Sequence, residues 1–95
     1  MEHELKIEKR YLDRIFDGTK TCEVRLNDRD YQVGDTIVFK WLYEYEVRLA
    51  EASFDGDYCV ERKNAYKITH VLCYPEALKE GWVILSIKPI KHFKP

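Results

Sequence analysis

Apolar and polar positions along the first part of the chain predict a short strand followed by a helix. Residues 3–7 alternate, with Leu5 and Ile7 on one face, which is typical of a strand. Residues 8–17 place their apolar side chains at the i, i+1, i+4, i+5 spacing of an amphipathic helix. Gly18 follows where a helix C-terminal cap is expected, so the helix is predicted to end there.

The next strand is predicted around residues 21–27 and carries charged side chains on one face. Because successive side chains of a strand point to opposite faces, Cys22, Val24 and Leu26 are expected in the core. The opposite face carries Thr21, Glu23, Arg25 and Asn27. This polar row is either a candidate site or a solvated surface. The alternation alone favours the solvated surface, since exposed ion pairs contribute only about 0 to 1 kcal/mol.

The middle of the chain is predicted to hold a central strand and then a charged segment. Residues 36–42 are apolar on both faces apart from Lys40, as expected of a buried strand. Residues 43–63 mix apolar side chains with acids, and they include the Asp55-Gly56 pair that is typical of a hairpin turn. They are therefore predicted to form a charged, exposed hairpin or loop.

The last third of the chain predicts two strands, at residues 66–74 and 82–87, with a turn at 75–80 between them. One early helix followed by several strands favours an α+β domain built on a small mixed β-barrel of five to six strands, with its edges hidden by closure or near closure. The predicted core consists of Ile37, Phe39, Trp41, Val71, Val83 and Leu85, with Leu12, Ile15 and Phe16 packed onto it from the helix.

Composition narrows the class of protein. The chain has 95 residues, which predicts a single domain over residues 1–95. Its 16 basic and 17 acidic side chains give no overall attraction for nucleic acid, although the C-terminal third is basic and the middle acidic. Three cysteines without a close pair favour reduced thiols, and the chain lacks long apolar runs. We therefore expect a cytoplasmic protein with no membrane contact, no metal and no cofactor.

Three motifs carry a resemblance to a known family. The sequence Gly18-x-Lys20-x-x-Glu23-x-Arg25 after a short helix is similar to the signature of the ASCH domain, a branch of the PUA-like β-barrels. Two further segments extend the match, residues 27–35 (NDRDYQVGD) and residues 81–85 (GWVIL). With them, the chain most closely resembles the DUF3850 subfamily of ASCH-like proteins.

The resemblance implies a cleft beside the helix and a ligand related to RNA or to a nucleotide. The implied cleft residues are Lys20, Glu23 and Arg25, with Asn27 and Arg29 near the rim. Lysine and arginine can hold a phosphate, while a carboxylate and an amide can read base edges. The expected RNA- or nucleotide-binding residues are Lys20, Thr21, Glu23, Arg25, Asn27, Arg29 and Tyr31. Tyr31 is included as a base-stacking residue because it lies in a polar turn.

Two alternatives remain open. Some ASCH-like proteins are amide hydrolases that pair the signature lysine with a threonine three positions later, where this chain has Glu23. A small hydrolase acting on an amide or phosphodiester bond would instead use Lys20 or Glu23 as the catalytic acid or base. A protein-interaction adaptor would use the acidic residues 43–63.

Overall fold

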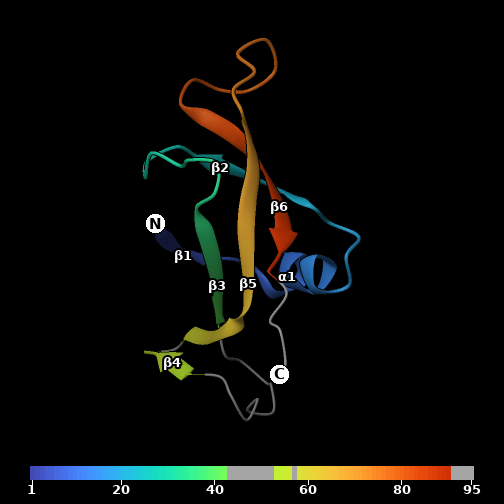
Figure 1. Ribbon diagram of the computed structural model, residues 1–95, viewed down its shortest axis with the longest axis vertical. Helices are drawn as coiled ribbons and strands as arrows, with labels where there is room; N and C mark the ends of the chain where they lie inside the picture. The colour runs from blue at the N-terminus through green and yellow to red at the C-terminus, as the bar shows by residue number, and fades with distance from the viewer. Residues whose placement is uncertain (43–52, 57, 91–95) are drawn as a thin grey trace.

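The computed structural model describes residues 1–42, 53–56 and 58–90, in which one helix and six strands are found (Figure 1). The elements in chain order are β1 (Glu2–Lys6), α1 (Lys9–Phe16), β2 (Cys22–Leu26), β3 (Thr36–Leu42), β4 (Ser53–Asp55), β5 (Tyr58–Leu72) and β6 (Trp82–Pro89). This mostly β fold with one short helix near the N-terminus agrees with the α+β prediction and with the expected number of strands.

The strands form one sheet in the order β1-β3-β5-β6-β2, with β4 attached to β5. β1 runs parallel to β3, and every other pair is antiparallel. Within the described part of the chain no backbone pairing joins β1 to β2, so both remain edge strands. The expectation that closure of the sheet hides these edges is therefore wrong, and side chains cover them instead, as described below.

Helix α1 follows the prediction closely. Glu8 and Asp17 are its two caps, and Gly18 takes a φ of 84°, the left-handed conformation that ends a helix. Leu12 is buried, as is Ile15. Phe16 was expected in the core, but 39% of it is exposed, and its ring lies edge-on against another aromatic ring, that of Trp41.

The core forms around β3, which lies between β1 and β5 (Figure 1). Side chains from both faces of β3 are buried, which confirms the prediction of a central strand. Of the predicted core, Val71 is only partly buried but packs against the cluster. The fully buried members of the predicted core are Ile37, Phe39, Trp41, Val83 and Leu85.

The predicted hairpin is present, although part of the segment lies outside the described residues. Asp55 of β4 pairs with Tyr58 of β5, and Gly56 between them has a φ of 60°. Residues 43–52 and 57 are not described. β5 begins at Tyr58, eight residues before the strand that the alternation predicted at residues 66–74.

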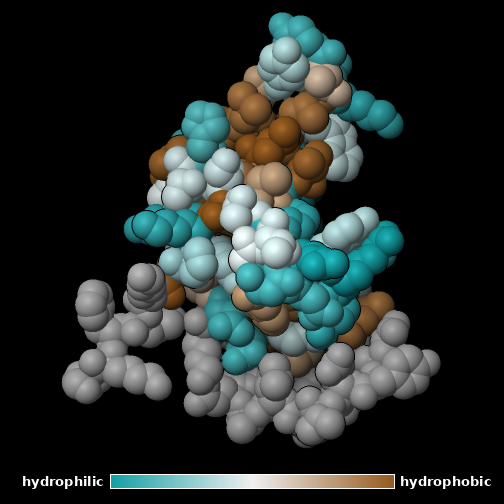
Figure 2. Space-filling model, turned by 90° about the vertical axis from the view of Figure 1, so that its right-hand side faces the viewer, coloured by the Kyte–Doolittle hydropathy of each residue, from teal (hydrophilic) through white to brown (hydrophobic). Residues whose placement is uncertain are grey.

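The two faces of β2 are the reverse of those predicted. Cys22 is exposed, as are Val24 and Leu26, whereas Glu23 is only 7% exposed and Arg25 is half-buried. The polar row thus points inward, because the sheet is open beside β2 and that side offers charged partners rather than an apolar core. Val24 and Leu26 are among the exposed large apolar side chains, and apolar residues gather on the upper part of the molecule (Figure 2).

Candidate functional site

A cleft of about 390 Å³ lies between the two edge strands. Residues 5–8 and Tyr11 of α1 line one side, and residues 23–26 of β2 line the other. The remaining lining residues are Asp28, Arg29, Tyr31 and Trp82. The cleft therefore lies at the open side of the sheet, where the inward face of β2 meets β1.

The Glu23 carboxylate is buried in this cleft between two cations. Lys20 Nζ lies 2.5 Å from Oε1, and Arg25 donates to Oε2 through Nε at 3.0 Å and Nη2 at 2.9 Å. Lys20 Nζ also donates to the backbone carbonyl of Cys22. A buried carboxylate without such partners would be strongly destabilising, so the two cations hold Glu23 in place, and Glu23 in turn fixes the direction of Arg25.

Two arginines bridge the open side of the sheet. Arg25 donates through Nη2 to the Lys6 carbonyl at 2.7 Å, and Arg29 donates through Nη1 to the Glu4 carbonyl at 3.2 Å. Because β1 bonds to β3 with alternate residues, the carbonyls of Glu4 and Lys6 face its free edge. We call this arrangement the arginine seam. Uncovered strand edges invite pairing with other chains, and the arginine seam covers this one.

Arg29 differs from Arg25 in its electrostatic surroundings. Among the residues that the structure describes, Arg29 forms no ion pair, and its guanidinium donates only to the Glu4 carbonyl. A guanidinium has five N–H donors, so Arg29 keeps donors and its full charge for a ligand. Arg25, by contrast, is held by Glu23.

Tyr31 lies at the inner wall of the cleft. Only 4% of it is exposed, and its ring packs edge-on against His3 with 4.9 Å between centroids. Burial raises the Tyr31 pKa above its ordinary value of 10.0, although the charges of Arg25 and Arg29 act in the opposite direction. Tyr31 was expected to stack on a base because it lies in a polar turn, but its ring is buried in the core cluster instead.

The remaining predicted site residues lie outside the cleft lining. Asn27 accepts a hydrogen bond from the backbone N–H of Tyr31 at 3.0 Å and so shapes the turn. Thr21 is exposed at the start of β2. The structure thus brings Glu23, Arg25, Arg29 and Tyr31 together, and Lys20 joins them through Glu23.

Sequence reasoning did not place in the cleft the lining residues that come from other elements. Lys6 and Glu8 line the cleft beside β1, and Tyr11 does so from α1 and Trp82 from β6. No local pattern identified them, because their nearness to Glu23 depends on which strands become the edges of the sheet.

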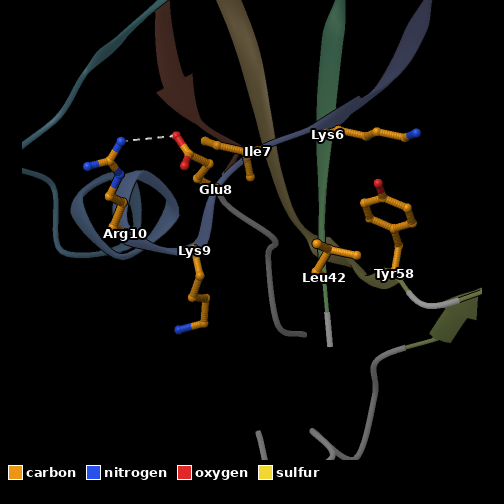
Figure 3. Close-up of a pocket in the computed structure, with 7 residues that line it drawn as sticks. All are labelled: Lys6, Ile7, Glu8, Lys9, Arg10, Leu42 and Tyr58. Carbon is orange, nitrogen blue, oxygen red and sulfur yellow. Dashed lines mark hydrogen bonds and ion pairs between the residues drawn. The ribbon is translucent and has the colours of Figure 1, made fainter. Parts of the chain in front are cut away.

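A second cavity, of about 480 Å³, lies at the start of α1 (Figure 3). Its charged groups have partners: Arg10 pairs with Glu8 at 3.3 Å, and Lys6 lies 4.7 Å from the centroid of the Tyr58 ring. None of its lining residues belongs to the predicted site. The lining residues are Lys6, Ile7, Glu8, Lys9, Arg10, Leu42 and Tyr58. We therefore take the cleft beside the arginine seam as the candidate site.

No helix in the described residues has the length and apolar character needed to cross a membrane. The same residues contain no group of three or more His, Cys, Asp or Glu side chains placed to hold a metal ion.

The fold and the cleft together define a small open-sheet domain whose edges are joined by arginine side chains. The family described as "Domain of unknown function (DUF3850)" matches residues 2–87, so the chain belongs to this family, which confirms the DUF3850 resemblance. The "Uncharacterized 12.9 kDa protein in GpA 3'region" of Escherichia phage P2 is 39% identical over 41 residues. That match covers 42% of this chain and 38% of the phage protein, which is less than two thirds of its length.

Proposed function

We propose that the cleft beside the arginine seam binds a nucleotide or a short stretch of RNA, with Arg25 and Arg29 directed to phosphate. One observation carries this proposal: two guanidinium groups line one cleft, one fixed by a buried carboxylate and the other without an ion-pair partner among the described residues. The Nε and Nη2 donors of Arg29 allow bidentate binding of phosphate, and Arg25 adds its Nη1 donor in a position already fixed by Glu23, which costs less to order on binding.

The size and mixed chemistry of the cleft support a nucleotide over a simple anion. A volume of about 390 Å³ lies within the range of small-molecule sites. The cleft also offers a carboxylate for base donors, from Asp28. The likeness of the Gly18–Arg25 motif to the ASCH signature supports the same class of ligand, and we include assignment to the ASCH branch of the PUA-like domains in the proposal.

The hydrogen bonding of Glu23 favours binding over hydrolysis. Both of its oxygens are engaged, Oε1 by Lys20 and Oε2 by Arg25. A general base needs an oxygen within reach of the proton it removes, and here the cations occupy both. Glu23 is thus better suited to hold Arg25 in position than to take up a proton.

The first prediction concerns Arg29. Arg29→Met should weaken binding of a single-stranded oligoribonucleotide about tenfold or more, since a hydrogen-bonded charge contributes about 1.5 to 3 kcal/mol. Calorimetric titration measures the change. Arg14→Met is the matched control, because Arg14 is exposed on α1 and does not line the cleft. Equal affinity of Arg29→Met and wild type, or no binding by wild type, would refute the proposal.

Glu23→Gln separates binding from catalysis in the same titrations. It keeps the shape and one acceptor but releases Arg25, so affinity should fall by about 1 to 3 kcal/mol. Wild-type protein incubated with RNA or with an acylated nucleoside should show no turnover by chromatography. Multiple turnover that disappears in Glu23→Gln at unchanged affinity would replace the binding proposal with a hydrolase.

A further inference from the structure

We infer that Trp82 is a stacking platform for an unpaired nucleobase at the mouth of this cleft. The inference rests on the proposed function and adds the class of ligand: a nucleotide or single strand whose base is recognised together with its phosphate. The chain has two tryptophans. Trp41 is 3% exposed in the core, whereas Trp82 is 36% exposed and lines the same cleft as Arg25 and Arg29.

Trp82 is the best placed of the three aromatic rings that line the cleft. Tyr31 is buried, and Tyr11 has the Arg10 guanidinium 4.5 Å from its ring centroid. Within the described part of the chain, neither an aromatic ring nor a cation stacks on Trp82. Trp82 thus combines exposure, a place in the cleft and a ring face without a stacking partner.

The backbone around Trp82 holds the residue at a fixed position. Its N–H donates to the Lys79 carbonyl at 3.0 Å, and it pairs with Leu26 across β6 and β2. Gly81 before it takes a φ of 84°, and a Cβ there would lie 3.3 Å from the Leu26 side chain. The backbone of Trp82 is thus held on one side by the turn before β6 and on the other by its pairing with β2. Such a residue is suited to binding, because its backbone does not have to become ordered when the ligand binds.

The chemistry of the cleft then selects the class of ligand. Stacking on an indole accepts any base, because every base has a π-face. In a duplex the base faces are already stacked on one another, so a protein that uses stacking takes single-stranded or free nucleotides. Arg25 and Trp82 come from opposite faces of the β2–β6 pair, Arg25 opposite Val83 and Trp82 opposite Leu26, and both line the cleft, so that one nucleotide would reach the guanidinium with its phosphate and the indole with its base.

The side chains around Trp82 form an apolar surface that another protein chain could cover in place of a nucleobase. Val24 and Leu26 are 51% and 46% exposed, and Ile84 lies opposite both Val24 and Leu72. These residues make the outer face of β2 and β6 apolar, so a partner protein or a second copy of the chain covering this face is an outcome that the test must detect.

The test uses two probes that differ only in the base, adenosine monophosphate and ribose 5-phosphate. In a Trp41→Phe background Trp82 is the sole tryptophan, and its fluorescence should be quenched saturably by the nucleotide and remain unchanged with ribose 5-phosphate. If Trp41→Phe does not fold, the quenching by nucleotide is compared between wild type and Trp82→Leu. It should be present in wild type and absent in the variant, because the remaining Trp41 is buried.

Affinities from calorimetry complete the test. Trp82→Leu should lower affinity for the nucleotide about tenfold, towards that for ribose 5-phosphate, and leave the latter unchanged. Tyr74→Leu is the matched control, since Tyr74 is 48% exposed but does not line the cleft, and its affinities should equal those of wild type.

The contrary results separate the two proposals. Equal binding of both probes with unchanged Trp82 fluorescence would overturn the stacking inference and leave phosphate binding intact. No binding of either probe would overturn the proposed function itself. Self-association that changes Trp82 fluorescence while nucleotide does not would assign the exposed indole to a protein interface and also overturn the inference.

Discussion

Asp35, at the start of β3, shows how one buried acid connects the N-terminal strand to the turn before β3. His3 Nε2 lies 2.8 Å from Oδ2, the Gln32 backbone N–H donates to Oδ2 at 3.1 Å, and the amino group of Met1 lies 3.2 Å from Oδ1. These contacts lower the Asp35 pKa from 3.8 to about 2. The hydrogen bond to His3 is the largest cause, and the one from the Gln32 amide is the next.

This pKa shift predicts a specific loss of stability in acid. The unfolded chain takes up the proton near pH 3.8, whereas the folded protein resists it until about pH 2, so Asp35 stabilises the fold above pH 3.8 and that contribution is lost as pH falls towards 2. Asp35→Asn should remove this dependence. Urea unfolding at pH 5.5, 4 and 3 checks it: the free energy of unfolding should fall more steeply for wild type than for the variant. Parallel curves would contradict the assignment.

At the residue scale the sequence predicted which side chains of β2 share a face better than it predicted what surrounds them. The alternation of β2 correctly separated Glu23 and Arg25 from Val24 and Leu26 but assigned the two sets to the wrong faces. Alternation identifies two faces, and polarity usually shows which one is inside. That rule fails here because Lys20, in the turn before β2, pairs with Glu23, and because an open sheet edge faces the charged row.

At the scale of elements, β3 is the strand on which the core depends. Phe39 is 2% exposed and its ring lies 5.8 Å from that of Tyr66. Phe39→Ala should lower the free energy of unfolding by about 3 to 5 kcal/mol, because it leaves a cavity that the neighbours fill only in part. Denaturant unfolding measures it, with Val33→Ala as the control, since Val33 is 64% exposed and should change little. A loss below about 1 kcal/mol for Phe39→Ala would show that the core lies elsewhere.

The accuracy of the predicted elements follows from how local their signals are. Gly18 marks the end of α1 through its own backbone conformation, so the helix was predicted almost to the residue. The first half of β5 was missed because Glu61, Arg62 and Lys63 interrupt the alternation. That half is a strand because it pairs with β3 and β4. Pairing with another strand cannot be seen in the alternation of the half itself.

For the whole molecule, charge distribution predicts how binding depends on salt. Lys67 and Lys88 lie opposite each other on β5 and β6, but neither lines the cleft. These two lysines of the basic C-terminal third are therefore not expected to contribute to phosphate binding in the cleft. With only Arg25 and Arg29 directed to phosphate, about two counterions should be released.

The corresponding measurement is affinity for a single-stranded oligoribonucleotide across a range of salt concentrations. The slope of log K against log salt should be about −1.4, from roughly −0.7 per phosphate contact on a single strand. Lys67→Gln and Lys88→Gln should leave both slope and affinity unchanged. A slope steeper than about −4, reduced by either substitution, would place the binding surface on β5 and β6 instead.

The open edge was the part of the whole-molecule arrangement that local patterns could not predict. Which strands end a sheet is decided by pairing between residues far apart in sequence, as when Glu2 of β1 meets Thr36 of β3. The family resemblance supplied the expected architecture, but it did not show that β1 and β2 would remain unpaired. The position of the cleft follows from that one fact.

The arginine seam has a mechanical consequence. A ladder of peptide hydrogen bonds fixes two strands at one spacing, about 4.8 Å, whereas a guanidinium on a flexible methylene stem keeps its bond while the spacing changes. Arg25 of β2 and Arg29 of the turn that follows it thus connect to β1 through side-chain hydrogen bonds alone. A change in the spacing on this one side would therefore alter two side-chain hydrogen bonds and leave every backbone ladder of the sheet intact.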